Sequence, residues 1–522
     1  MIEDFSFYLA LVVLIVFLIM LSNKIKLAYP ILLVIAGLII SFIPGVPVLK
    51  IEPELIFIIF LPPLLYDAAW FNSWKELWHW RRIIGSFAFV VVFLTAVSVA
   101  FVANFFIPGF TLALGFLLGG IVSPPDAVSA GAILKFVKVP KRVSSILEGE
   151  SLLNDASSLI IFRFALISVV TGQFIWYEAA LSFIWMVIGG VGIGMLIGVI
   201  FCKTQKFFPT DANMDIILSL VTPYIIYITA EEFHASGILA VVSGSLYLSY
   251  NRHHFLSSSS RLRAETVWQS FIFLLNGLVF LLIGLDLPEI TSGLKQEGIS
   301  FYDATLFALL ITLVLMFGRM LVAYGAVIVT KIASLFITVA DKNPGNRLPF
   351  VLGWAGMRGV VSLAAALSIP VTLDGSPFPH RNLILYITFI VILATLVLQG
   401  TTLPFVIKKV RIPSFHDHLP KAETEKLLRK ELAKVSLEYL KLNGKESEYS
   451  IHLQKWVREW EFDIDSKDKS IPPDDFTLYK NILEEQRQIL LKINRSRELV
   501  DEEIIRRFLH KIDLEEENLK QD

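Results

Sequence analysis

The stretch from residue 148 to residue 158, EGESLLNDASS, places three carboxylates inside a long apolar part of the chain. Ser151 and Asp155 are four residues apart and share one face of a helix, while Glu150 and Asn154 form a second such pair about 100° around it. A charged side chain at the centre of a bilayer costs about 2.5–3.5 kcal/mol on insertion scales. These residues must therefore face a protein interior or a water-filled cavity, where carboxylate and hydroxyl oxygens can hold a proton or a hard cation.

A second unusual segment is TLALGFLLGGIVSPPDAVSAGAILKF, in which Pro124 and Pro125 fall in the middle of a predicted helix. Proline removes a backbone donor and clashes with the preceding turn, so we expect the helix to unwind around Ser123–Asp126. A simple proline kink is the alternative. A broken helix is favoured because Asp126 lies at the break, where freed carbonyls and half-helix ends can form an ion site.

Arg358 lies deep in the segment GWAGMRGVVSLAAALSIP, whose small residues allow close helix packing. A buried arginine needs an anion, and Asp155 should stay free for ions, so we expect Glu150 to be its partner. We also expect a second helix break near residues 353–359. Asp67 follows another Pro-Pro pair and is either a carboxylate of a cytoplasmic funnel or an interfacial residue that reaches water.

Other polar residues of the apolar segments carry less information. Arg163 lies two turns beyond Asp155 and either snorkels outward or pairs within the core. We interpret Arg319 and Asn276 as structural residues, and Glu231 and Glu232 as residues of a solvated mouth.

Composition agrees with a membrane protein. The chain has 522 residues, of which 55% are hydrophobic and 18% charged, whereas soluble domains are about 45–50% apolar and 25% charged. This excludes an ordinary soluble enzyme, and one cysteine, Cys202, excludes an internal disulfide. We predict an all-α polytopic fold, because backbone groups in lipid need internal partners. Thirteen spans are expected, at about 6–23, 29–43, 53–70, 83–107, 111–136, 144–171, 179–202, 212–230, 235–250, 267–286, 302–331, 348–371 and 382–408.

Lysine and arginine gather in alternate loops, which predicts the orientation of the chain. One alternating set of loops holds most of the lysine and arginine residues, and the loops between them hold only Lys50, Lys295 and Arg381. We therefore expect the N-terminus outside the cell membrane and the tail in the cytoplasm. Residues 1–412 form the predicted transmembrane domain, and the highly charged residues 413–522 form a predicted small helical domain, either a packing or dimerisation element or a regulatory sensor.

Five segments resemble the monovalent cation:proton antiporters of the sodium/proton exchanger type. GESLLNDASSLIIFRFAL resembles the Asn-Asp signature of that family, and four others match family segments in the same order: LPPLLYDAAW, VSPPDAVSAGAI, LLNGLVFLLIGLDL and GWAGMRGVVSLAAALSIP. The resemblance covers roughly residues 8–410. It implies a homodimer of 13-span protomers, each with a dimer domain and a moving core domain of two six-helix bundles with inverted repeats and broken helices.

The resemblance also implies roles for individual residues. Asp155 is the ion-binding and proton-accepting carboxylate, Asn154 supports it, and Ser151 supplies a hydroxyl ligand. Asp126 stands at the broken helix, and Asp67 in the cytoplasmic funnel. Na⁺ would be held by Asp155, Asp126 and Ser151.

Two further positions complete this set. Glu150 and Arg358 correspond to the family's structural ion pair in the core. Pro125 is a departure, because many members have threonine there and proline leaves only its backbone carbonyl as a ligand. The choice among Na⁺, Li⁺ and K⁺ stays open for this reason.

The expected function is exchange of Na⁺ for H⁺ in pH homeostasis, with the two ions competing for Asp155 as the core exposes it to either side. One titrating aspartate beside a neutral asparagine predicts electroneutral one-for-one exchange. We expect no resident cofactor, no nucleic-acid partner and no enzymatic activity, since the sequence has no phosphate-binding glycine loop, zinc-ligand spacing or nucleophile elbow. A cation channel and an intramembrane aspartyl hydrolase are the alternatives.

Overall fold

The structure is a computed structural model of the whole chain. It describes residues 2–25, 27–43, 53–72, 74–134, 137, 139–172, 176–285, 287–335, 345–373, 376–411 and 433–438, and the single positions or pairs 457, 461, 483–484, 486, 488, 512 and 514.

The chain divides into two compact units, Met1–Phe415 and His416–Asp522. The helices discussed below belong to the first unit. In the second unit the structure describes a helical stretch at 433–438 and a few single positions. The predicted helical tail of 413–522 therefore lies almost wholly outside the described residues.

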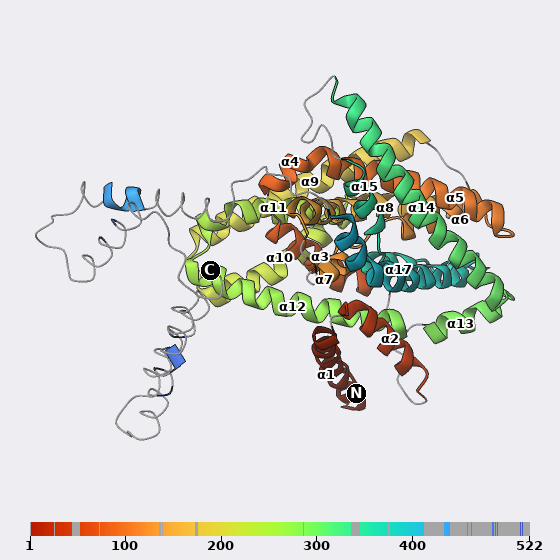
Figure 1. Ribbon diagram of the computed structural model, residues 1–522, viewed down its shortest axis with the longest axis horizontal. Helices are drawn as coiled ribbons and strands as arrows, with labels where there is room; N and C mark the ends of the chain where they lie inside the picture. Colours follow the sequence, from red (N-terminus) through yellow and green to blue (C-terminus); the bar gives the residue numbers. More distant parts are fainter. Residues whose placement is uncertain are drawn as a thin grey trace, which may run out of the picture. The chain divides into compact units, whose positions relative to one another are not determined.

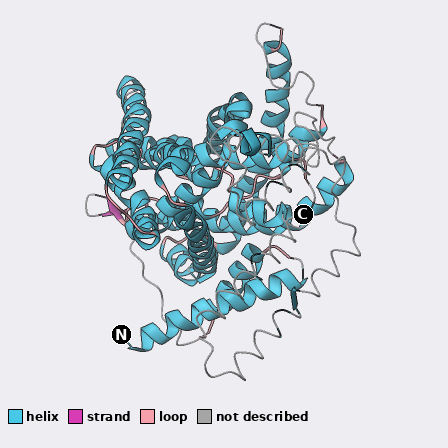
Figure 2. Ribbon diagram, turned by 90° about the vertical axis from the view of Figure 1, so that its left-hand side faces the viewer, coloured by secondary structure: helices cyan, strands magenta, loops and turns pink. Residues whose placement is uncertain are grey.

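The first unit is almost entirely helical (Figure 2). A hairpin of two-residue strands, β1 (Thr372–Leu373) and β2 (Ser376–Pro377), lies before the last helix. The helices are α1 (Ile2–Ile25), α2 (Tyr29–Ser41), α3 (Pro53–Phe71), α4 (Trp74–Gly85), the π-helical turn η1 (Ser86–Val91), α5 (Val92–Phe106), α6 (Leu112–Val122), α7 (Ala127–Leu134), α8 (Lys141–Thr171), α9 (Trp176–Phe207), α10 (Ala212–Glu232), α11 (Gly237–Phe255), α12 (Ser258–Leu285), α13 (Leu287–Gln296), α14 (Phe301–Ala333), α15 (Arg347–Trp354), α16 (Val360–Leu367) and α17 (Arg381–Val410).

Nine helical stretches within the described residues are long and apolar enough to cross a membrane, and two more, Tyr29–Ser41 and Phe57–Phe71, are shorter apolar helices. The chain is thus a multi-pass membrane protein. Two further predicted spans fall on α11 and on the interrupted pair α15 and α16. The count of thirteen spans remains a prediction, because these elements fall short of the length or hydropathy of a regular membrane helix.

The helices pack as two groups. The α12 group comprises α1, α2, α3, α9, α10, α11 and α12, and the α8 group comprises α4, η1, α5, α6, α7, α8 and α13–α17. Contacts are much denser within each group than between the two. Figure 1 shows α2 beside α12 in the first group and α5 beside α6 in the second.

Both predicted helix breaks are present, and both lie in the α8 group. The α6 helix ends at Val122 and α7 begins at Ala127, so Ser123–Asp126 are unwound as the Pro-Pro pair predicts. The α15 helix ends at Trp354 and α16 begins at Val360. An inverted repeat relating the two remains a prediction.

Large apolar side chains cover the outer faces of the helices. Phe105 on α5 is 81% exposed and Leu321 on α14 is 73% exposed, with many similar residues on α1 and α9. A soluble protein rarely exposes so much contiguous apolar surface. Contact with lipid accounts for it.

Candidate functional site

The two unwound segments cross and are joined through their main chains. The backbone N–H of Asp126 donates to the carbonyl of Met357 at 2.7 Å. Residue 359 must be glycine here, because a Cβ atom built on Gly359 would lie 2.7 Å from Cγ of Asp126. The crossing thus brings the ends of four half-helices together at one point.

Arg358 closes the carboxyl end of α6. Its side chain is fully buried. Its guanidinium donates to the carbonyl of Val122 at 2.8 Å, to that of Ser123 at 3.4 Å and to that of Gly356. A positive group is favourable at the carboxyl end of a helix, where unpaired carbonyls carry partial negative charge.

The predicted ion pair between Glu150 and Arg358 is wrong. Glu150 is paired with Arg319 of α14: Nη1 and Nη2 of the guanidinium donate to its two carboxylate oxygens at 2.7 and 2.9 Å. Arg358 satisfies its donors on main-chain carbonyls instead. Both Glu150 and Arg319 are almost wholly buried, so each neutralises a charge that would otherwise be unpaired.

Sequence reasoning assigned Arg319 only a general structural role. The signal that could have found it is a lone arginine in the long apolar segment 301–333, which needs a buried anion as much as Arg358 does. With two buried arginines and one glutamate, the sequence alone does not decide the pairing, and Arg358 was the wrong choice. The choice depends on how α8 and α14 face each other, and the Nε of Arg319 is further fixed by the carbonyl of Leu352 at 3.3 Å.

Asp126 is the N-terminal cap of the half-helix α7. Its carboxylate accepts from the backbone N–H groups of Val128 at 3.0 Å and Ser129 at 3.2 Å, and from the Ser129 hydroxyl. Such a cap satisfies donors that a helix start leaves unpaired. Asp126 therefore has a structural task in addition to the predicted role of an ion ligand.

Asn154 and Ser151 tie α8 to the first break. The side-chain amide of Asn154 donates to the carbonyl of Pro125 at 3.0 Å, and Oγ of Ser151 accepts from the N–H of Ala127 at 3.2 Å. The sequence-predicted residues Ser151, Asn154, Pro125 and Asp126 thus lie together. A carbonyl has two lone pairs, so that of Pro125 keeps one for another donor or a cation.

Asp155 differs from all its neighbours. Its side chain is 7% exposed, and within the described part of the chain its carboxylate accepts no hydrogen bond and forms no ion pair. Asp126 lies nearby, because the N–H of the next residue, Ala127, donates to Ser151, one turn before Asp155 on α8. An uncompensated buried carboxylate costs on the order of several kcal/mol in its charged form. A bound proton or cation would remove this cost.

Asp67 lies apart from these hydrogen bonds. It is half-buried on α3, in the α12 group, and its Oδ1 atom has no hydrogen-bond partner in the described structure. Its predicted position in a funnel remains a prediction.

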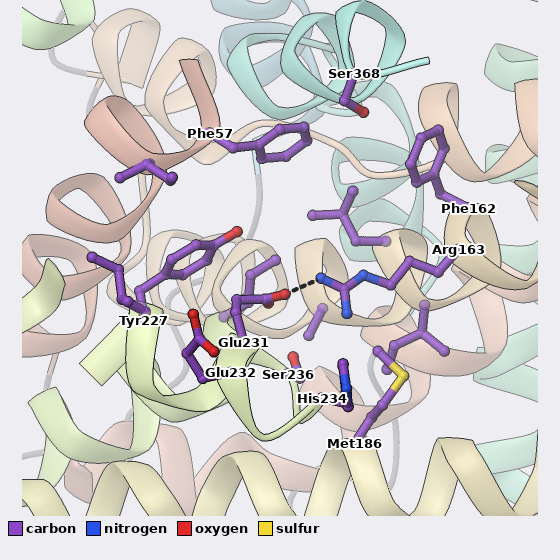
Figure 3. A pocket seen from close by; sticks show the side chains of 16 residues that line it. Phe57, Phe162, Arg163, Met186, Tyr227, Glu231, Glu232, His234, Ser236 and Ser368 are labelled. Atoms are coloured by element: carbon purple, nitrogen blue, oxygen red, sulfur yellow. Dashed lines mark hydrogen bonds and ion pairs between the residues drawn. The ribbon is translucent and has the colours of Figure 1, made fainter. Parts of the chain in front are cut away.

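A cavity of about 600 Å³ lies between the two helix groups (Figure 3). Ala156, the neighbour of Asp155, contributes to its wall from α8, and Glu231, Glu232 and Tyr227 line it from α10. Arg163 forms an ion pair with Glu231 across it. Of the two roles left open for Arg163, pairing within the protein is the one observed.

The family model described as "Sodium/hydrogen exchanger, transmembrane" matches residues 10–409. The chain belongs to the sodium/hydrogen exchanger family. The resemblance seen in the five sequence motifs is confirmed by this match over most of the chain.

Among the similar members of the sodium/hydrogen exchanger family is the sodium, potassium, lithium and rubidium/H⁺ antiporter of Bacillus pumilus. It is 35% identical over 392 residues, which cover 73% of this chain and 58% of the relative. The chain thus spans less than two thirds of that relative's length. An uncharacterized Na⁺/H⁺ exchanger of Mycobacterium bovis is 30% identical over 516 residues, which cover 96% of this chain and 93% of that relative.

The exchanger fold is also seen among solved structures. The sodium proton antiporter MjNhaP1 of Methanocaldococcus jannaschii superposes with a TM-score of 0.63, covering 78% of this chain and 99% of its own at 18% identity. At this level of identity the likeness concerns the fold.

Proposed function

We propose that this protein exchanges Na⁺ for H⁺ across the cell membrane, one for one, by exposing Asp155 alternately to the two sides. The observation that carries the proposal is the Asp155 carboxylate, buried beside a helix crossing with no hydrogen-bond or ion-pair partner among the described residues. Membership in the sodium/hydrogen exchanger family supports it.

The coupling follows from competition for one carboxylate. A proton neutralises Asp155 directly, and Na⁺ neutralises it as a hard cation that prefers oxygen ligands. Further oxygens are available on Ser151, on Asp126 and on the carbonyl of Pro125, each tied to α8 or α7 by the hydrogen bonds described above. The two ions cannot occupy the carboxylate together, so binding one releases the other.

Movement of the site between the two sides requires that it be neutral. The α8 group carries Asp155 and packs on the α12 group through sparse contacts, so a relative displacement of the groups breaks few interactions. An empty, charged Asp155 would have to cross the apolar interface uncompensated, which is costly. Only the protonated or cation-bound site moves, and uncoupled leak is suppressed.

One titrating carboxylate sets the stoichiometry. Asn154 beside it is neutral and is engaged with the carbonyl of Pro125. The buried ion pair of Glu150 and Arg319 carries no net charge. One H⁺ therefore exchanges for one Na⁺, and no net charge crosses the membrane.

Hard alkali-metal cations are the expected substrates. We take Na⁺ as the expected substrate, with Li⁺ and K⁺ as the cations to compare, because the Bacillus pumilus relative is named for several alkali cations. Pro125 offers a carbonyl but no hydroxyl, so selectivity rests on the remaining oxygens.

The proposal also covers the oligomeric state of the protein and its orientation in the membrane. The protein forms a homodimer in the cell membrane, with the N-terminus outside and residues 413–522 in the cytoplasm, and serves pH homeostasis. The gathering of lysine and arginine in alternate loops supports the orientation.

The test is collapse of a preset pH gradient in proteoliposomes on addition of Na⁺, Li⁺ or K⁺, followed with an entrapped pH indicator. Na⁺ should collapse the gradient, Asp155→Asn should not, and Glu232→Gln serves as a control outside the crossing. Imposing a membrane potential with a gradient of a permeant anion such as thiocyanate should leave the Na⁺-driven rate unchanged.

Three results would contradict parts of this proposal. Na⁺-driven proton flux in Asp155→Asn would remove Asp155 from its role. A steady current that follows the Na⁺ gradient would rule out electroneutral exchange. Cation flux without any proton movement would indicate a channel.

A further inference from the structure

The cavity between the helix groups reaches the surface at Glu232 and His234, which are exposed. Figure 3 shows Arg163 extending into this cavity from α8 toward Glu231 of α10. Arg163 and Glu231 both lie toward the helix ends that are remote from the lysine- and arginine-rich loops. Apart from Arg163 itself, the basic residues of α8 are Lys141 and Arg142 at its start, and the last basic residue before α10 is Lys206.

Glu231 is held in place by its own helix group. Its Oε1 atom accepts from the backbone N–H of Gly237 at 3.1 Å, at the start of α11. Position 237 has no room for a side chain, since a Cβ atom there would lie 2.7 Å from the Tyr227 ring and 2.9 Å from the Glu231 carboxylate. The partial positive charge of a helix start also favours a carboxylate at this place. One carboxylate oxygen of Glu231 is therefore hydrogen-bonded within the α12 group.

The other oxygen of Glu231 reaches the opposite group. Oε2 accepts from Nη2 of Arg163, whose side chain leaves α8. The α8 and α10 helices share few contacts otherwise. The ion pair is thus a direct polar link between the helix that carries Asp155 and the helix bundle it must move against.

The link lies close to the ion site along α8. Arg163 follows Asp155 by eight residues, a distance of about 12 Å along the helix axis. Between them, Ala156, Leu159 and Ile160 form the cavity wall. A displacement of α8 by a few ångströms relative to α10 separates the guanidinium from the carboxylate, since an ion pair requires contact within about 4 Å.

We propose that Arg163 and Glu231 are positioning residues that latch the two helix groups in the arrangement in which this cavity is open, and that the latch parts when Asp155 is exposed to the other side. The proposal rests on the proposed alternating access. The latch sets the balance between the two arrangements and contributes little to folding, because the two side chains are 39% and 29% exposed.

The test measures access to the cavity without measuring transport. In a Cys202→Ser background, Leu159→Cys places a single thiol on the cavity wall. Its rate of labelling by a membrane-impermeant maleimide is followed with the full chain in lipid nanodiscs. Arg163→Gln, Glu231→Gln and the double variant are compared with Glu232→Gln, which lines the same cavity outside the ion pair. Glutamine at 231 keeps an oxygen for the N–H of Gly237, so the local backbone contact is retained.

Each single variant should slow labelling about threefold, the size of a weak ion pair. The double variant should be no slower than either single one, because both remove the same interaction. Glu232→Gln should label at the parent rate, and thermal midpoints should stay within about 3 °C of the parent. Unchanged labelling in either single variant, additive losses in the double variant, or equal slowing in Glu232→Gln would overturn the latch.

Na⁺/H⁺ exchange by the parent protein in proteoliposomes separates this proposal from the proposed function. If the parent does not exchange ions, the proposed function fails whatever the labelling shows. If it does, labelling decides on the latch alone. The single variants should also lower kcat for Na⁺-driven exchange about threefold, with less change in KM, because Arg163 and Glu231 do not bind the ion.

Discussion

Glu150 and Arg319 form a two-point ion pair between α8 and α14, with both side chains almost wholly buried. The α8 helix therefore carries two buried carboxylates, five residues apart, of which one has a charged partner and the other has none in the described structure. Glu150 is neutralised by a fixed arginine, whereas Asp155 has no such partner in the described structure. This difference assigns a structural task to the first and leaves the second available for ions.

Removing one member of the buried pair should destabilise the protein strongly. Glu150→Ala should lower the free energy of unfolding by about 3–5 kcal/mol, because it leaves Arg319 charged and unpaired in the core. The loss should appear as a lower thermal midpoint and poorer recovery of folded protein in detergent.

The control for this change is Glu148→Ala on the same helix, since Glu148 is exposed and should tolerate replacement. Glu150→Gln combined with Arg319→Met should be more stable than Glu150→Ala, because no unpaired charge remains. A Glu150→Ala protein with the parental midpoint would contradict the importance of the pair.

Replacing Arg358 should impair folding without changing cation preference. Arg358→Ala removes the donors for the carbonyls of Val122, Ser123 and Gly356, which are buried at the crossing. Each unsatisfied buried group costs about 1–3 kcal/mol. Thermal unfolding and size-exclusion profiles would show the loss, and a stable variant with altered Na⁺ and Li⁺ selectivity would oppose this assignment.

Sodium should stabilise the folded protein through Asp155. A ligand at about 100 times its Kd adds about 2.7 kcal/mol to the free energy of unfolding, so the thermal midpoint should rise with Na⁺ in the parent protein. Protons compete for the same carboxylate, so the rise should shrink as the pH is lowered.

Asp155→Asn should fold with a midpoint no lower than the parent in Na⁺-free buffer, because it removes an uncompensated buried charge. It should show no Na⁺-dependent rise at any pH. Choline chloride at equal concentration controls for ionic strength. A sodium-dependent rise of parental size in Asp155→Asn would place the binding site elsewhere.

The close approach at the crossing should make position 359 intolerant of any side chain. Gly359→Ala would press its methyl group against Asp126, whose backbone N–H holds the two breaks together. We expect a loss of about 1–3 kcal/mol in stability, the usual size of overpacking, together with loss of Na⁺/H⁺ exchange.

Gly131→Ala is the matched control, because a Cβ atom at Gly131 on α7 meets nothing within 4 Å. It should exchange ions at nearly the parental rate. Equal activity of Gly359→Ala and Gly131→Ala would show that the crossing is more adaptable than its geometry indicates.

The sequence predicted the local features that depend on single residues. Two adjacent prolines cannot continue a helix, so the break at Ser123–Asp126 could be placed to the residue. The i, i+4 spacing of Ser151 and Asp155 and the apolar surroundings indicated an inward-facing site. These inferences needed only helix geometry and the cost of burying charge.

The pairing of distant residues could not be predicted in the same way. Whether Glu150 meets Arg319 or Arg358 depends on how three helices are rotated about their axes, and apolar segments with similar faces on all sides do not fix that rotation. Likewise, the cap that Asp126 provides for α7 depends on where the chain re-enters a helix. The ion pair between Arg163 and Glu231 also depends on packing, because it forms only where the end of α10 lies beside α8.

The crossing of the two breaks is held by a hydrogen bond that the backbone N–H of Asp126 donates to the backbone carbonyl of Met357. Apart from a change to proline at 126, no amino-acid substitution deletes either partner. Side chains nearby can therefore diverge during evolution while the main-chain frame that presents them is inherited intact. Descendants of one ancestral exchanger could in this way acquire new cation preferences without having to invent a new architecture.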